Sequence, residues 1–314
     1  MNKFLLILYV LIGSLTFGQN LVYNGDFEIY DTCPKSTSIP GDLQIEHCTG
    51  WTAPRFLGTS DYFNECNNAT PSNFAGVPYN ILGYQPAYNG VGYCGFFAWD
   101  IDFEFDYREY IQNKLSNPLE AGKEYKLSFY VSNQGSAYSL IRIGALFSHN
   151  NYNSDSYAPI VSTPQVVNQN DYLIDSLGWT KIEGSFVAKG GEEYLTFGYF
   201  EDSVSVFDTL NTHTDEFISK SAYYFIDGIE LIEVISIPNV ITPNDDNSNE
   251  FFELNFNYKK VSIFNRWGDL IWVGSDGQYW NGRTQNGVNV SEGTYFYIIE
   301  TDTKKHQGFV QVIR

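Results

Sequence analysis

The sequence lacks several features that mark common classes of protein. After Leu15 it contains no apolar stretch near the roughly 20 residues that span a bilayer, so we expect no transmembrane segment in the mature chain. It has four histidines, and none of them belongs to a His-Glu-x-x-His metal motif. Gly-x-Ser-x-Gly elbows and Gly-rich phosphate loops are also missing. Local motifs therefore give no support to an enzyme.

Positive charge is scarce. The chain carries 18 Lys and Arg against 37 Asp and Glu, and most of the imbalance lies in residues 19–237, with 10 basic and 28 acidic side chains. Nucleic acid and anionic lipid head groups attract basic surfaces, so this composition predicts no nucleic-acid partner and no electrostatic attachment to a membrane. High solubility in a crowded medium is the simplest explanation of the acidity.

The first 18 residues have the organisation of a signal peptide. Lys3 precedes an apolar core from Phe4 to Leu15, and a short segment ending in Gly18 follows. A charged start, a short apolar core and a small residue at the cleavage site are typical of secretory leaders. We therefore expect residues 1–18 to be removed and the protein to pass through the periplasm.

Cysteine is also rare, and all four cysteines lie in the first third of the mature chain: Cys33, Cys48, Cys66 and Cys94. The absence of a Cys-x-x-Cys spacing argues against zinc and against a thioredoxin-type redox centre. An even number in an exported protein favours disulfides, and four cysteines allow three pairings. We expect Cys33 to pair with Cys48 and Cys66 to pair with Cys94.

The body of the chain, residues 19–235, is predicted to be all-β, because its apolar residues show no sustained 3.6-residue period. Residues 108–115 and 125–132 alternate between polar and apolar side chains, and a turn-forming segment separates them, which predicts a hairpin. Many short strands in a chain of this length predict a two-sheet sandwich. Further strands are expected at residues 140–147, 179–187, 194–200 and 223–234.

An acidic run lies between Trp99 and Tyr107, where alternation would place four carboxylates on one face of a strand. Neighbouring acids on that face would be about 6.6 Å apart, a spacing also found between the two carboxylates of inverting glycosidases. Those carboxylates, however, approach a sugar from opposite sides, whereas neighbours on one strand point the same way. A solvated strand edge is the better interpretation.

The two ends of the body resemble a known module. The segment from Asn20 to Glu28, the Gly50-Trp51 pair and the segment from Tyr224 to Leu231 resemble galactose-binding-like jelly-roll domains of the carbohydrate-binding kind. The resemblance implies a structural calcium ion, held in part by Glu28 and Asp227. Calcium prefers several oxygen ligands, which suits two carboxylates. The alternative is that both are ordinary exposed acids.

Aromatic residues are plentiful, and five of them crowd one interval of the body. Sugar-binding surfaces are commonly built from exposed rings beside polar groups, so this interval is our candidate glycan site, away from the proposed ion. The alternative is that the rings only fill and cover β-sheets. The five candidates are Tyr79, Tyr84, Tyr88, Tyr93 and Trp99.

The C-terminal segment, residues 236–314, carries several blocks in a recognisable order. They include Ile237 to Asn247, Val261 to Gly268, Tyr279 to Gly282 and Gly293 to Ile299. These blocks resemble the gliding-motility-associated C-terminal domain, the type B sorting domain of the type IX secretion system. The resemblance implies a small immunoglobulin-like β-sandwich, and the type IX machinery and an outer-membrane partner as its binding partners. At the end of the first block and just beyond it, residues 244–249 are expected to form an Asx-rich turn and not a cation site.

Together these features predict a two-domain, all-β protein, a jelly-roll sandwich followed by a sorting domain, that is secreted or displayed on the outer cell surface. Our first hypothesis is a binding protein whose N-terminal module recognises glycan or mediates adhesion. The second is a structural surface or matrix protein without a small-molecule ligand. The third is a polysaccharide hydrolase.

Overall fold

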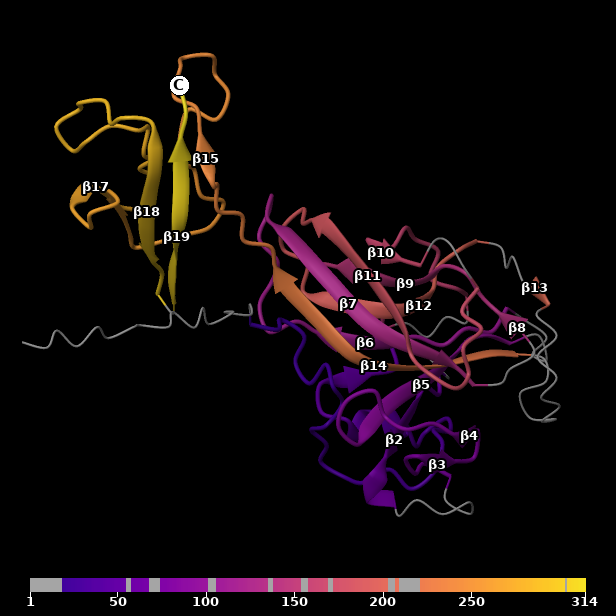
Figure 1. Ribbon diagram of the computed structural model, residues 1–314. Helices are drawn as coiled ribbons and strands as arrows, with labels where there is room; N and C mark the ends of the chain where they lie inside the picture. Colours follow the sequence, from indigo (N-terminus) through magenta and orange to yellow (C-terminus); the bar gives the residue numbers. More distant parts are fainter. Residues whose placement is uncertain are drawn as a thin grey trace, which may run out of the picture. The chain divides into compact units, whose positions relative to one another are not determined.

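The computed structural model describes residues 19–54, 58–67, 74–100, 106–134, 138–153, 158–168, 172–202, 207–208, 221–302 and 304–314. The expected signal peptide, residues 1–18, lies outside this part of the chain. Contacts between residues divide the chain into two compact units, Met1–Glu233 and Val234–Arg314. Figure 1 shows the strands of both units.

The N-terminal unit contains two five-stranded antiparallel sheets. The first has the order β1-β6-β12-β9-β10, and the second has the order β11-β7-β14-β5-β2. The strands of the first sheet are β1 (Trp51–Thr52), β6 (Ile111–Lys114), β12 (Tyr194–Tyr199), β9 (Ile143–Ser148) and β10 (Val166–Val167). Those of the second are β11 (Thr180–Val187), β7 (Glu124–Asn133), β14 (Ser221–Glu233), β5 (Gly92–Asp100) and β2 (Asp61–Asn64).

Smaller elements complete this unit. Two strand pairs stand apart from the main sheets, β3 (Tyr79–Asn80) with β4 (Gly83–Tyr84) and β8 (Tyr138–Ser139) with β13 (Phe207–Asp208). Within the described residues, the helical elements are two 3-10 turns, η1 (Gln44–His47) and η2 (Glu65–Asn67). The expectation of an all-β chain is confirmed.

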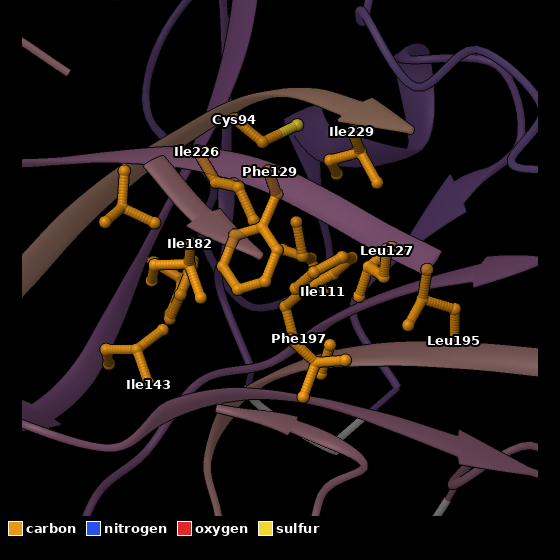
Figure 2. Packing of buried hydrophobic residues seen from close by; sticks show 14 of the residues in the cluster. Cys94, Ile111, Leu127, Phe129, Ile143, Ile182, Leu195, Phe197, Ile226 and Ile229 are labelled. Atoms are coloured by element: carbon orange, nitrogen blue, oxygen red, sulfur yellow. The ribbon is translucent and has the colours of Figure 1, made fainter. Parts of the chain in front are cut away.

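The main core lies between the two sheets, where each strand contributes every second side chain. On β7, Leu127 and Phe129 are buried on this inner face, because successive side chains of a strand point to opposite sides. The ring of Phe129 packs edge-on against that of Phe197 from β12, with the centroids 4.9 Å apart. Figure 2 shows Phe129 surrounded by aliphatic side chains from both sheets. Truncating such a buried ring to Ala typically costs about 3–5 kcal/mol, so this layer contributes much of the stability of the sandwich.

The predicted hairpin at residues 108–132 is wrong. Strand β6 belongs to the first sheet and β7 to the second, so the connection between them crosses from one sheet to the other. Leu115 and Leu119 in this connection are buried in the core, and their backbone N–H groups donate to the carbonyls of Glu193 and Glu192. Alternation describes both strands correctly, but it does not specify which neighbour each strand pairs with.

A second apolar cluster covers part of the outer face of the second sheet. It contains Phe63, Tyr93 and Phe225 from the sheet itself, and Val77 and Leu82 from the segment between β2 and β5. This long segment therefore packs on the β2-β5-β14 side of the sheet. The outward side chains of β7 and β11 lie beyond the cluster.

The expected cysteine pairing is also wrong. A disulfide joins Cys33 to Cys66, with Cα atoms 6.0 Å apart, whereas Cys48 and Cys94 are buried thiols. Folding brings η2 beside the segment after Cys33, where the Asn67 side chain donates to the carbonyl of Pro34 at 2.6 Å. Sequence spacing could not reveal this contact, because it depends on how the segment between β2 and β5 folds back.

The C-terminal unit is built on one five-stranded sheet with the order β15-β19-β18-β16-β17. Its inner face packs on Phe252, Leu254 and Trp280, which come from the irregular segments of the unit. Val261 and Ile263 are buried on one strand, and Gly268 ends the following turn at φ +87°. The strands are β15 (Val240–Ile241), β16 (Lys260–Phe264), β17 (Leu270–Gly274), β18 (Gly293–Glu300) and β19 (Lys305–Val312).

Candidate functional site

The candidate site is built around an irregularity in β14. The pairing register of β14 with β7 shifts between Asp227 and Glu230, and Gly228 adopts a left-handed conformation with φ +61°. Such a bulge bends a strand and redirects its side chains. The Asp227 carboxylate accepts hydrogen bonds from the backbone N–H groups of Tyr88 at 2.8 Å and Asn89 at 3.0 Å. It thereby holds the segment that precedes β5 against the bulge.

Glu28 holds the same segment from the other side. One of its carboxylate oxygens accepts from the backbone N–H groups of Val91 at 2.7 Å and Gly92 at 2.9 Å. We expected the ion candidates Glu28 and Asp227 to lie away from the aromatic interval, and this is wrong. Both carboxylates anchor residues 88–92, which belong to that interval.

Tyr88 is the exposed aromatic residue that these anchors position. Its ring stacks on that of Tyr130 from β7, with centroids 3.6 Å apart and planes inclined by 17°. A hydrogen bond with the Tyr130 side chain raises the pKa of Tyr88, because it favours the protonated hydroxyl. A Cβ atom at Gly228 would lie 2.7 Å from Tyr88 and 3.0 Å from Tyr130. Glycine at the bulge therefore permits the stacked pair.

A surface groove of about 540 Å³ runs beside this tyrosine pair. One wall is the N-terminal segment, which is fixed to β14 because the N–H of Ile229 donates to the carbonyl of Gly25 at 2.8 Å. The opposite wall is the outer face of β7 and β11. Residues that line the groove include Asn20, Asp26, Tyr88, Ser128, Tyr130, Lys181 and Glu230.

The groove combines rings with polar groups of both charge signs. Lys181 is paired with Glu183 at 2.8 Å, and Lys126 contacts the same carboxylate at 2.9 Å. These two cations lower the pKa of Glu183 to about 2. Fixed donors and acceptors beside aromatic rings can bind an uncharged ligand rich in hydroxyl groups.

The other predicted aromatic residues do not join the groove. Tyr79 and Tyr84 are exposed and pack edge-on against each other across β3 and β4, 4.8 Å between centroids. Tyr93 is fully buried, and its hydroxyl donates to the carbonyl of Gln85 at 3.0 Å. Trp99 is buried against Tyr138. Tyr93 and Trp99 are therefore wrong as ligand-binding candidates, because the strand pleat turns both rings into apolar layers.

Sequence reasoning missed Tyr130 and Lys181. The signal for Tyr130 was present, since Lys126, Ser128 and Tyr130 alternate with buried residues along β7. The signal for Lys181 was the same period in β11. Alternation alone assigns these side chains to an outer face, but only the order of the strands places them next to each other and to Tyr88.

The two carboxylates proposed for calcium differ in environment. Burial raises the pKa of Asp227 to about 8, and the nearby charge of Glu28 adds to that shift, while the N–H donors of residues 88, 89 and 228 oppose it. Within the described residues, no group of three or more His, Cys, Asp or Glu side chains is placed to hold a metal. Glu28 and Asp227 could thus supply two ligands, and backbone carbonyls would have to supply the rest.

The acidic run at residues 99–107 lies mostly outside the described residues, because 101–105 are not among them. At its ends, Asp100 is buried, and Asp106 forms an ion pair with Arg108, one of whose oxygen–nitrogen distances is 2.9 Å. These two acids therefore differ from the solvated edge that we expected.

The Asx-rich turn predicted in the C-terminal unit is confirmed. Asp245, Asn247 and Asn249 adopt left-handed conformations, which Asn and Asp tolerate better than most residues. Between them, the Asp246 carboxylate accepts from the backbone N–H of Ser248 at 2.8 Å. The turn follows β15, which pairs in parallel with β19 near the end of the chain.

This C-terminal unit has a family assignment. Residues 235–312 match the CHU_C type IX secretion signal domain. The predicted sorting domain is thereby confirmed, and a type IX secretion signal domain implies export to the cell surface or the medium. No helix of the described residues is long and apolar enough to cross a membrane.

Several solved structures match part of the chain at low identity. The CBM22-1–GH10 modules of a Clostridium thermocellum endo-1,4-β-D-xylanase, complexed with xylohexaose, are 11% identical, with a TM-score of 0.32 over 67% of this chain and 31% of that one. The K1 cleaved adhesin domain of Lys-gingipain from Porphyromonas gingivalis W83 is 14% identical, with a TM-score of 0.29 over 58% and 90%. Its K2 adhesin domain is 10% identical, with a TM-score of 0.32 over 68% and 97%. At these TM-scores the similarity assigns no function.

The chain spans about a third of the length of the xylanase polypeptide that it matches. No curated protein matches the chain. The type IX secretion signal domain thus gives the destination of the protein, and a function for the N-terminal unit has to be argued from its own residues.

Proposed function

We propose that this protein is a secreted or surface-displayed binding protein, exported by the type IX secretion system, whose N-terminal unit binds glycan in the groove beside Tyr88 and Tyr130. The observation that supports this proposal is the stacked, partly exposed tyrosine pair at the edge of a groove with mixed polar groups. An acidic unit of this kind would meet its ligand outside the cell.

The chemistry of the groove suits a neutral sugar. A pyranose ring has an apolar C–H face that packs on an aromatic ring, and a rim of hydroxyl groups that both donate and accept hydrogen bonds. Tyr88 offers the aromatic surface, and its exposed fraction of 45% leaves ring area for a ligand. Asn20, Lys181 and Glu230 offer donors and acceptors around it.

The groove is also well ordered for binding. Tyr88 is fixed by its stacking partner, and its backbone is fixed by the buried carboxylate of Asp227. Side chains that are already held in position lose less conformational entropy when a ligand binds. A ring that is already held in this way is a favourable platform for a ligand.

A structural calcium ion remains part of the proposal. It would lie between Glu28 and Asp227 and would offset the repulsion between two carboxylates that now depend on backbone N–H donors. When bound, the ion would supply charge neutralisation. Its role would be to keep residues 88–92 in place, so it would support the groove indirectly.

A glycan array on the purified protein tests the binding function, followed by calorimetry on the best ligand. Tyr88→Ala and Tyr130→Ala should each weaken binding at least tenfold, because stacking and the shape of the groove are lost. Tyr84→Ala is the matched control, since it removes an exposed tyrosine that does not line the groove, and its affinity should equal that of the wild type.

Three outcomes would contradict the proposal. Absence of binding to any glycan would favour a structural surface or matrix role. Loss of binding in Tyr84→Ala but not in Tyr88→Ala would move the site to the β3–β4 hairpin. Release of reducing ends from a bound polysaccharide would make the protein a hydrolase.

A further inference from the structure

Two of the four cysteines remain as thiols in the N-terminal unit, and they come from distant parts of the sequence. Cys48 follows η1, where its N–H donates to the carbonyl of Ile45 at 3.0 Å. Cys94 lies in the middle of β5, paired with Tyr62 on one side and Ile226 on the other. Both side chains are completely buried in the main core.

The two thiols belong to the same buried cluster of the core. Burial, and after it a hydrogen bond with the neighbouring Cys48 side chain, raises the pKa of Cys94. On its other side, the Cys48 sulfur accepts a hydrogen bond from the Asn24 amide at 3.4 Å. Asn24 itself is fixed, because the same amide donates to the carbonyls of Ile29 and Thr49. These contacts fix the position of the Cys48 sulfur in the core.

We propose that Cys48 and Cys94 form a second disulfide bond in the exported protein. One Sγ–Sγ bond replaces two S–H bonds, and the two protons and two electrons pass to a protein or small-molecule disulfide, which is reduced to two thiols. Such exchange is the usual chemistry of oxidising compartments. Because both sulfurs are inaccessible after folding, the bond forms before η1 and β1 pack onto β5.

The proposed bond would interlock with the first one. The residues occur in the order 33, 48, 66 and 94, so the Cys33–Cys66 and Cys48–Cys94 loops overlap in sequence. Cys94 follows Tyr88 by six residues, and Cys48 precedes β1. Together the two bonds would fasten both ends of the long segment that carries Tyr79, Tyr84 and Tyr88.

Peptide mapping of the wild-type protein tests the proposal without any substitution. Protein recovered from the culture medium or cell surface is denatured without reductant, alkylated, digested and analysed by mass spectrometry. A cross-linked peptide that contains Cys48 and Cys94 is expected, with no alkylated cysteine. Alkylation of both residues would overturn the proposal and would leave them as buried core thiols. A cross-link from either residue to Cys33 or Cys66 would also overturn it.

Two variants sharpen the result. In the Cys33→Ala/Cys66→Ala variant, the Cys48–Cys94 cross-link should persist, because the contact belongs to the main core. In Cys48→Ala, Cys94 should become alkylatable after denaturation, and the melting temperature should fall by an amount on the order of 10 °C. If Cys94 is already alkylatable in the wild type, no such difference will appear and the proposal fails.

Discussion

Asp61 and Glu109 are two carboxyl groups inside the N-terminal unit, outside the groove. Asp61 accepts from the Tyr223 hydroxyl at 2.7 Å and from the N–H of Ser38 at 2.6 Å. Glu109 accepts from the hydroxyls of Thr59 at 2.6 Å and Tyr107 at 2.7 Å. Burial raises the pKa of both groups, and the charge of Glu109 raises that of Asp61 further. These two residues hold loops against the sheet, and their titration makes the stability of the N-terminal unit depend on pH.

The pH dependence has a definite sign. A carboxyl group whose pKa is higher in the folded state stabilises the protein fully below its unfolded pKa, near 4, and this stabilisation is lost as the pH rises toward the folded pKa. The free energy of unfolding of the N-terminal unit should therefore fall as the pH rises above the unfolded pKa, near 4. Asp61→Asn should reduce that slope by up to about 1.4 kcal/mol per pH unit. The variant lacks a carboxyl group that binds one proton in the folded state and releases it on unfolding.

Urea unfolding at several pH values, followed by tryptophan fluorescence, measures this slope. The control is Glu46→Gln, which removes an exposed carboxylate and should leave the slope unchanged. An identical slope in Asp61→Asn and in the wild type would show that Asp61 is not protonated in the folded state.

At the scale of elements, the bulge of β14 connects three parts of the fold. Its Asp227 carboxylate holds residues 88 and 89, its Ile229 N–H binds the N-terminal segment, and its Gly228 leaves room for the stacked tyrosines. Residues 88–89, the N-terminal segment and Tyr130 of β7 are far from one another in the sequence. A regular strand at this position would fill the space that the rings occupy, so the irregularity is what makes the groove.

The calcium prediction belongs to this element. If Glu28 and Asp227 share an ion, chelation should lower the melting temperature of the protein, since a ligand that binds only the folded state stabilises it by mass action. The chelator should have no effect on Asp227→Asn, which removes one ligand. Glycan affinity should fall in the same variant, because Asp227 also holds the backbone of Tyr88.

Differential scanning calorimetry with and without chelator gives the measurement. Glu183→Gln serves as the control, because it removes an acid on the outer face of β11 and should retain the calcium response. Superimposable melting curves, in protein verified to be metal-free at the start, would show that backbone N–H donors alone stabilise the two carboxylates.

At the scale of the whole molecule, the chain divides its tasks between two units. The charge difference follows this division, since nearly all the excess acidity lies in residues 19–237 and the C-terminal segment, residues 238–314, has 7 basic against 9 acidic side chains. The type IX secretion signal domain has its own core around Trp280 and Ile299. Export and binding can therefore be separated by truncation.

A chain that ends at Val234 should cross the inner membrane and accumulate in the periplasm, because it retains the expected signal peptide and lacks the type IX secretion signal domain. Cell fractionation and surface labelling measure its location. Full-length Tyr88→Ala is the control and should reach the surface at wild-type levels, since its substitution lies in the other unit. Protease resistance of the truncated chain establishes that it is folded.

Surface labelling of the truncated chain at full-length levels would contradict a sorting role for residues 235–312. Periplasmic retention of the control would show instead that export depends on the N-terminal unit.

The sequence by itself determined the strands, the two units and the destination of the protein, because these depend on local pattern. Period-2 alternation identified β7, and contiguous blocks identified the sorting domain. Only the tertiary structure decided that β6 and β7 lie in different sheets, that Cys33 pairs with Cys66, and that Tyr93 and Trp99 are buried. It also brought Tyr88 to Tyr130. Each of these outcomes depends on which distant strands become neighbours, and that choice is made by burial of the whole apolar surface, which no short stretch of sequence records.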